Sequence, residues 1–170
     1  RARLNLSLVR LEDVEVIFKA TPKSKGGNHW GSRLVIAPDN TLFITLGDRW
    51  DHKEDSQDPG NHFGTIVRIN KDGTIPEDNP FKSHESYDPA VYSYGHRNPQ
   101  GLTLHPDTAT IWQHEHGPKG GDEINIIKPG VNYGWPEVTF GINYWGTKIS
   151  DKTTAPGMED PVHQWTPSIA

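Results

Sequence analysis

The sequence contains no cysteine, a single methionine and few apolar residues. The absence of cysteine among 170 residues excludes disulfides and thiolate metal ligands. Only 32% of the residues are hydrophobic, and no apolar run is long enough to cross a bilayer, so we expect no membrane insertion. No segment shows the periodicity of an amphipathic helix. The net charge of -5 argues against a nucleic acid or an anionic membrane as partner.

Glycine and proline, in contrast, are abundant, with 17 and 14 residues. Such frequent chain reversals favour many short strands joined by turns and loops, and therefore an all-β fold. The chain is also long enough to bury a sizeable core.

Two internal repeats support this interpretation. A shift of 68 residues places Leu34 and Ile36 on Leu102 and Leu104, each pair followed by a Pro-Asp turn, and a shift of 57 residues places 64–73 on 121–130. Each copy is expected to form consecutive antiparallel strands. The strands are predicted over 34–36, 41–46, 91–94, 102–104 and 110–113 and within the two repeats 64–73 and 121–130, with two more over 4–8 and 14–18.

Repeated antiparallel strands are typical of β-propeller blades. We interpret 1–27 as the end of a preceding blade, 28–95 as one blade, and 96–170 as the next blade and the start of another. About two to three blades are therefore present. Because a propeller needs at least four blades to close its ring, we expect the remaining blades to lie outside this chain.

The repeat also predicts where functional side chains meet. Successive strands of a blade reverse direction, so the loop before the first strand and the loop between the second and third open on one face. This places His29, Arg97, Asn98 and the loop at Gly117 near the central channel.

Five ordered motifs carry a family resemblance, and they cover nearly the whole chain from about Gly27 onward. They resemble the soluble aldose sugar dehydrogenases that use pyrroloquinoline quinone, the glucose/sorbosone dehydrogenase group of six-bladed propellers. The motifs are His29-Trp30-Gly31-Ser32-Arg33-Leu34, Thr45-Leu46-Gly47-Asp48-Arg49, Gly95-His96-Arg97-Asn98-Pro99-Gln100-Gly101-Leu102, Glu115-His116-Gly117-Pro118 with Gly121-Asp122-Glu123-Ile124-Asn125, and Asn132-Tyr133-Gly134-Trp135-Pro136.

The resemblance implies a quinoprotein oxidoreductase. Such an enzyme oxidises the anomeric carbon of an aldose sugar to a lactone and passes hydride to calcium-bound pyrroloquinoline quinone (PQQ). It implies Ca²⁺ as a second cofactor, a separate electron acceptor, and a periplasmic or secreted location.

His29 is the candidate general base. An imidazole titrates near neutral pH and can take the hydroxyl proton from the anomeric carbon, and the resemblance assigns this role to the position. For an isolated histidine, a hydrogen-bonding surface residue beside Trp30 is the alternative.

Arg97 and Asn98 are the candidate cofactor-binding residues. A planar cation and an amide suit the carboxylates and carbonyls of a quinone, and the resemblance places both on the cofactor. The alternative is a structural salt bridge from Arg97 to Asp48 or Asp122.

The resemblance also indicates two calcium sites. Gly117 and Pro118 would offer backbone carbonyls, the oxygen ligands that Ca²⁺ accepts. Glu123 and Tyr133 match a second, structural calcium site, because a buried carboxylate needs a compensating charge. A turn without a ligand, and a Glu123 facing Lys119 or Lys128, are the alternatives.

Two segments remain secondary candidates. The charged insertion 48–62 is interpreted as a solvated loop rather than a metal site, because its acidic and histidine residues are irregularly spaced. Tyr144 and Trp145 lie in an aromatic, glycine-rich run and could stack on sugar or fill a core.

Two other functions compete with the dehydrogenase. The first is a non-enzymatic binding propeller of the same superfamily, which has no need of His29, Arg97, Asn98 and the Gly-Pro turn together. The second is a calcium-dependent hydrolase, which needs carboxylates and amides around a central metal at matching blade positions, and these are not found.

Overall fold

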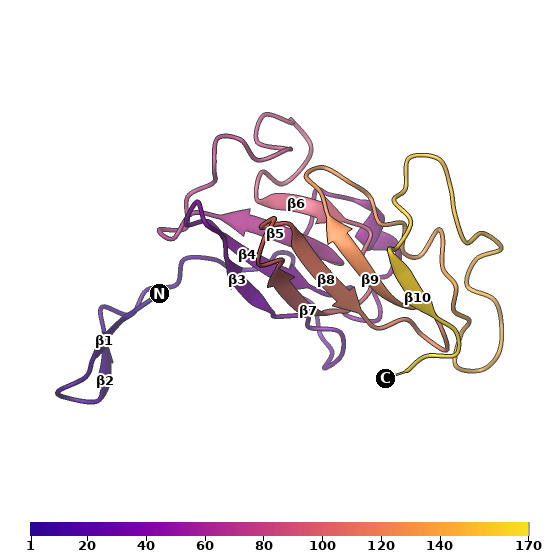
Figure 1. Ribbon diagram of the computed structural model, residues 1–170, viewed down its shortest axis with the longest axis horizontal. Coiled ribbons are helices and arrows are strands. Elements are labelled where there is room, and N and C mark those ends of the chain that lie inside the picture. The colour runs from indigo at the N-terminus through magenta and orange to yellow at the C-terminus, as the bar shows by residue number, and fades with distance from the viewer. Residues whose placement is uncertain (170) are drawn as a thin grey trace.

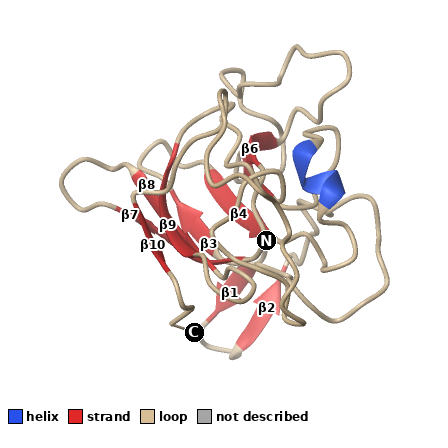
Figure 2. Cartoon of the chain, turned by 90° about the vertical axis from the view of Figure 1, so that its right-hand side faces the viewer, coloured by secondary structure: helices blue, strands red, loops and turns tan. Residues whose placement is uncertain are grey.

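The chain folds almost entirely into short antiparallel strands joined by long loops (Figure 1). The computed structural model describes residues 1–169. Within that range the only helix is the single-turn 3-10 helix η1 (Glu54–Gln57), which Figure 2 shows apart from the strands. The all-β prediction is confirmed.

Two four-stranded sheets form the body of the molecule. The first contains β3 (Leu34–Ile36), β4 (Leu42–Leu46), β5 (Thr65–Ile69) and β6 (Val91–Tyr94), and the second contains β7 (Pro99–Leu104), β8 (Ile111–Glu115), β9 (Asp122–Ile127) and β10 (His163–Trp165). In each sheet, strands consecutive in sequence are neighbours. The predicted repeat therefore corresponds to two sheets of the same topology.

The last strand belongs to the second sheet. Gln164 pairs with Glu123, and Trp165 pairs with Asp122. The segment that we had interpreted as the start of another blade thus supplies the outer strand of this sheet. The division of the chain into blades stays a prediction.

The N-terminal segment differs from the prediction. The hairpin pairs β1 (Arg3–Asn5) with β2 (Arg10–Glu12) and stands away from the body (Figure 1). Residues 14–18 form no strand. Their alternating pattern has another cause, because Ile17 and Phe18 pack on the outer face of the first sheet.

The main hydrophobic core lies between the two sheets. Phe43 and Ile66 of the first sheet cluster with Leu102, Ile111 and Ile127 of the second. This packing follows from period-two alternation, which turns every second side chain of a strand to the same face. It fixes the two sheets, and hence the loops at their ends, relative to each other.

No helix in the described part of the chain is long and apolar enough to span a membrane.

Candidate functional site

Two glycines allow the backbone around His29 to pack closely against the end of β4. A Cβ on Gly47 would lie 2.2 Å from the carbonyl oxygen of His29, and one on Gly31 would lie 2.7 Å from the carbonyl oxygen of Thr45. Only glycine permits these approaches. His29 itself has a φ of 51°, an uncommon left-handed conformation that is often found at functional sites.

Asp48, which follows β4, holds His29 in place. The Nδ1 of His29 lies 2.6 Å from Oδ1 of Asp48, and both side chains are almost completely buried. Since a carboxylate can only accept, Nδ1 carries the proton and Nε2 is left as the proton-accepting nitrogen. This is the geometry of a base oriented by a carboxylate.

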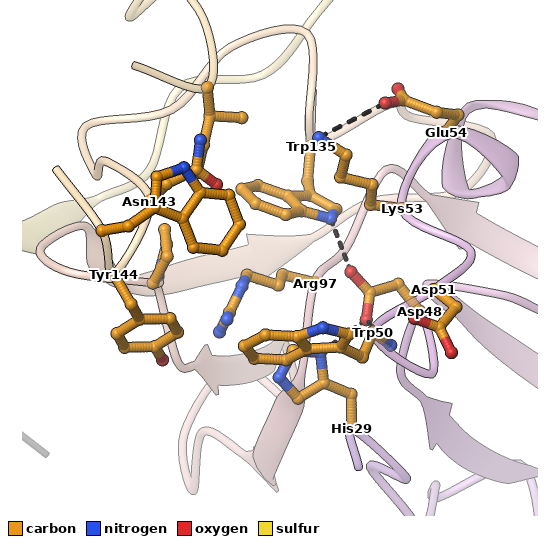
Figure 3. A pocket seen from close by; sticks show the side chains of 13 residues that line it. His29, Asp48, Trp50, Asp51, Lys53, Glu54, Arg97, Trp135, Asn143 and Tyr144 are labelled. Carbon is orange, nitrogen blue, oxygen red and sulfur yellow. Dashed lines mark hydrogen bonds and ion pairs between the residues drawn. The ribbon is translucent and has the colours of Figure 1, made fainter. Parts of the chain in front are cut away.

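Asp48 is itself held by neighbouring groups. The backbone N–H of Trp50 donates to its Oδ1 over 2.8 Å, and the indole Nε1 of Trp135 donates to its Oδ2 over 2.8 Å (Figure 3). Its own N–H donates to the carbonyl oxygen of Arg97 over 2.8 Å. Asp48 therefore ties together the loops that carry the two main candidates.

Arg97 contacts backbone carbonyls, and Asp48, one of its two alternative salt-bridge partners, pairs with His29 instead. The Nη1 of Arg97 donates to the carbonyl oxygens of His116 and Gly117, over 2.9 and 2.8 Å. The guanidinium carbon is 5.4 Å from the ring centroid of Trp135. Arg97 is thus a buried cation held by carbonyls and an aromatic ring.

The candidate base and the candidate cofactor-binding residues line two overlapping cavities. A cavity of ≈ 440 Å³, here called the His29 cavity, is lined by His29, Asp48, Trp50, Arg97, Trp135 and Tyr144 among others (Figure 3). A second cavity of ≈ 460 Å³ shares His29, Arg97 and Pro118 with it and adds Asn98 and Gly117. The structure therefore brings together the candidates that the repeat had placed on one face.

The two carbonyls predicted to bind calcium are both hydrogen-bonded. The oxygen of Gly117 accepts from Arg97, and the oxygen of Pro118 accepts from the hydroxyl of Ser168 over 3.2 Å. Each carbonyl keeps a second lone pair. A cation at Gly117 would nevertheless have to share its oxygen with the Arg97 guanidinium or displace it.

Glu123 lies in a buried acidic environment. It sits directly opposite Glu115 in the β8–β9 pair. Burial, with the charge of Glu115 adding to it, raises the pKa of Glu123 to about 8. The side-chain oxygen of Asn125 nearby is buried without a hydrogen-bond partner. Lys128, an alternative partner of Glu123, pairs with Glu159 instead.

A small cavity of ≈ 10 Å³ adjoins Glu115, Gly117, Glu123 and Tyr133, which is room for about one water-sized particle. The Tyr133 hydroxyl donates to the carbonyl of Ile126 and accepts from the N–H of Lys128. The hydroxyl is thus occupied, and the backbone carbonyl is the oxygen that Tyr133 could offer a metal. No group of three or more His, Asp or Glu side chains suited to a metal occurs among residues 1–169.

The insertion 48–62 contributes more than a solvated loop. Sequence reasoning missed Asp48 and Trp50 as site residues, and it left Trp135 without a role. The hydroxyl of Ser56 in this insertion donates to the carbonyl of Trp135 over 2.8 Å. The signal available in the sequence was the position of Asp48, two residues after a strand whose end faces the site.

Comparison with known proteins places the whole chain in one group. The family model described as glucose/sorbosone dehydrogenase matches residues 1–170. The chain is 43% identical over 170 residues to the aldose sugar dehydrogenase YliI of Escherichia coli, covering 99% of this chain and 46% of that protein.

Solved structures of the same group are similar to this chain. The crystal structure of the soluble aldose sugar dehydrogenase of Escherichia coli in the apo-form has a TM-score of 0.94 at 42% identity, over 98% of this chain and 48% of that chain. The PQQ-bound aldose sugar dehydrogenase of Streptomyces coelicolor has a TM-score of 0.74 at 36% identity, over 92% of this chain and 41% of that chain. The chain thus spans about half the length of these relatives, as the prediction of a partial propeller requires.

Proposed function

Because the chain belongs to the glucose/sorbosone dehydrogenase family, we propose that it carries part of the active site of a PQQ-dependent aldose sugar dehydrogenase. The reaction would convert the anomeric C–OH of an aldose to a lactone. The observation that carries the proposal is the His29–Asp48 pair, which faces the same cavity as Arg97.

His29 would act as the general base. Asp48 fixes the tautomer, so that Nε2 can accept the proton of the anomeric hydroxyl. Once protonated, the imidazolium would stay next to the carboxylate of Asp48, which stabilises the positive charge. Burial of both side chains strengthens this electrostatic interaction.

Arg97 and Asn98 would hold the cofactor. When bound, PQQ supplies the adjacent carbonyls that accept the hydride. The residues present fit such a group, because a buried guanidinium and a buried amide line the cavity that also contains His29. Arg97 would stabilise negative charge on the cofactor oxygens.

Calcium is proposed at two places. Gly117 and Pro118 would hold the ion next to the cofactor through their carbonyls, in competition with Arg97 at Gly117. Glu123 and Tyr133 would hold a structural ion, and the facing carboxylate of Glu115, the unsatisfied Asn125 oxygen and the small cavity all suit a cation.

Three further features are proposed from the similarity to the relatives. The other half of the propeller would contribute the remaining cofactor contacts, a separate acceptor would reoxidise the cofactor, and the location would be periplasmic or secreted.

The proposal is tested by reconstitution. The full-length protein is loaded with PQQ and Ca²⁺, and dye reduction is followed with several aldoses. Sugar-dependent reduction that needs both additions is the expected result. If no aldose is turned over, with or without PQQ and Ca²⁺, the result would instead favour a non-enzymatic binding propeller.

A further inference from the structure

Aromatic side chains from two separate loops line the mouth of the His29 cavity. Trp50 follows β4 and is 41% exposed, whereas Tyr144 and Trp145 lie between β9 and β10 and are 53% and 72% exposed. Large aromatic faces left open beside a buried polar pair are typical of ligand sites rather than of packing.

Trp50 has a fixed position relative to the candidate base. Its ring centroid lies 5.2 Å from that of His29, and 5.7 Å from that of Tyr144, with which it is nearly parallel at 9°. Figure 3 shows Trp50 beside His29, with Tyr144 across the cavity mouth. Trp50 thus touches both the base and the facing loop.

The backbone reinforces this position. Trp50 has a φ of 70°, and its N–H donates to the same Asp48 oxygen that accepts from His29. One carboxylate therefore holds both the imidazole of His29 and the backbone that carries the Trp50 side chain. A left-handed conformation at a bulky residue is uncommon, and it persists where neighbouring contacts enforce it.

We propose that Trp50, braced by Tyr144, forms the stacking wall of a pyranose subsite and so determines how tightly an aldose binds next to His29. The inference rests on the proposed dehydrogenase function and names the part of this chain that holds the sugar.

The chemistry of a sugar ring fits this wall. A pyranose has apolar C–H faces and a rim of hydroxyls, so one face can pack on an indole while the rim forms hydrogen bonds. The cavity offers this combination, since Asp51, Lys53, Glu54 and Asn143 provide polar groups around the aromatic wall. A ring seated on Trp50 would bring its hydroxyls close to the imidazole.

The test uses steady-state kinetics of the reconstituted full-length protein with D-glucose as probe. Trp50→Ala should raise KM about tenfold, as loss of an aromatic contact does at binding sites, with a smaller change in kcat. Trp50→Phe keeps a flat ring and should recover most of the affinity. Tyr144→Ala should raise KM less than Trp50→Ala, because it removes only the brace.

Trp112→Ala is the matched control, because Trp112 lies on β8 and lines neither of the two cavities that contain His29. Its KM should stay close to that of the wild type. A second measurement avoids turnover: saturation-transfer NMR of D-glucose with the cofactor-free protein should show contact that Trp50→Ala weakens.

The failures are distinguishable. Unchanged KM in Trp50→Ala, an equal effect of Trp112→Ala, or a fall in kcat alone would overturn the subsite while leaving the dehydrogenase in place. Absence of turnover by the wild-type protein with any aldose would overturn the dehydrogenase and the subsite together.

Discussion

Asp48 connects more of the site than any residue that the sequence had singled out. It pairs with His29 through Nδ1, accepts from the Trp50 N–H and the Trp135 indole, and donates its own N–H to Arg97. The types of the candidate residues could be predicted from the motifs. The partners of Asp48 could not, because they come from three loops that only the fold brings together.

We therefore expect Asp48→Asn to lower kcat by about 10²- to 10⁴-fold, because an amide can donate to Nδ1 and thereby favour the wrong tautomer. The measurement is kcat as a function of pH with saturating cofactor. Asp107→Asn is the control, since Asp107 lies in the exposed turn between β7 and β8 and does not line the cavity. Equal activity of the two variants would contradict the assigned role of Asp48.

Glu123 makes the stability of the metal-free protein depend on pH. Its pKa is raised to about 8 by burial, with a contribution from Glu115, so the folded state binds more protons than the unfolded state between the ordinary value of 4.5 and about 8. Stability should accordingly fall as the pH rises through this window.

The check is the Tm of thermal unfolding, measured between pH 5 and 8 with a chelator present. In Glu123→Gln the Tm should depend less on pH than in the wild type. Added Ca²⁺ should raise Tm most at the alkaline end, where the carboxylate is charged. A wild-type profile as flat as that of Glu123→Gln would refute the assignment.

At the scale of elements, the strands could be predicted well because two independent signals agree, namely the alternating pattern and the internal repeat. The predictions for β3 and β6 match the observed strands residue for residue, and those for β4, β5, β7, β8 and β9 lie within a few residues. No strand had been predicted at β2 or β10. Residues 14–18 show the alternating apolar pattern but have no counterpart in the internal repeat. Their apolar side chains pack on the first sheet, but the segment does not form a strand of it. Pattern alone could not separate these two outcomes.

The end of β4 is the element that positions the base. Gly47→Ala would place a methyl group 2.2 Å from the His29 carbonyl oxygen, and overpacking of this kind costs about 1–3 kcal/mol. We expect lower stability and a loss of turnover, measured by denaturant unfolding and dye reduction. Gly27→Ala, where the added methyl meets nothing within 4 Å, should behave like the wild type. Similar stability and turnover in both variants would show that Gly47 and the His29 carbonyl are not packed this closely.

At the scale of the molecule, the chain corresponds to about half of its relatives, and one sheet face is open. Leu34 and Ile36 are 57% and 56% exposed and line an apolar hollow with residues 15–18. The sequence predicted missing blades because two sheets cannot close a ring. Which face is left open depends on three-dimensional packing, which the strand pattern does not specify.

In the full-length protein we expect another blade to cover Ile36. Ile36→Asp should then destabilise that protein by about 2–4 kcal/mol, because it buries an unpaired charge. Thr108→Asp, in an exposed turn, is the control for the added charge. Unfolding in urea distinguishes them, and an equally small effect of both changes would mean that this face stays open to solvent.

The central claim is that His29 removes the proton from the substrate. Its most direct test compares His29→Gln with His52→Gln in the reconstituted full-length protein, with aldose-dependent dye reduction and bound-quinone absorbance measured on the same samples. His52 stacks on Phe63 in the neighbouring insertion and does not line the His29 cavity. The account predicts that His29→Gln loses about 10²- to 10⁴-fold in kcat with the quinone still bound, while His52→Gln stays near the wild type. Wild-type turnover by His29→Gln would contradict it.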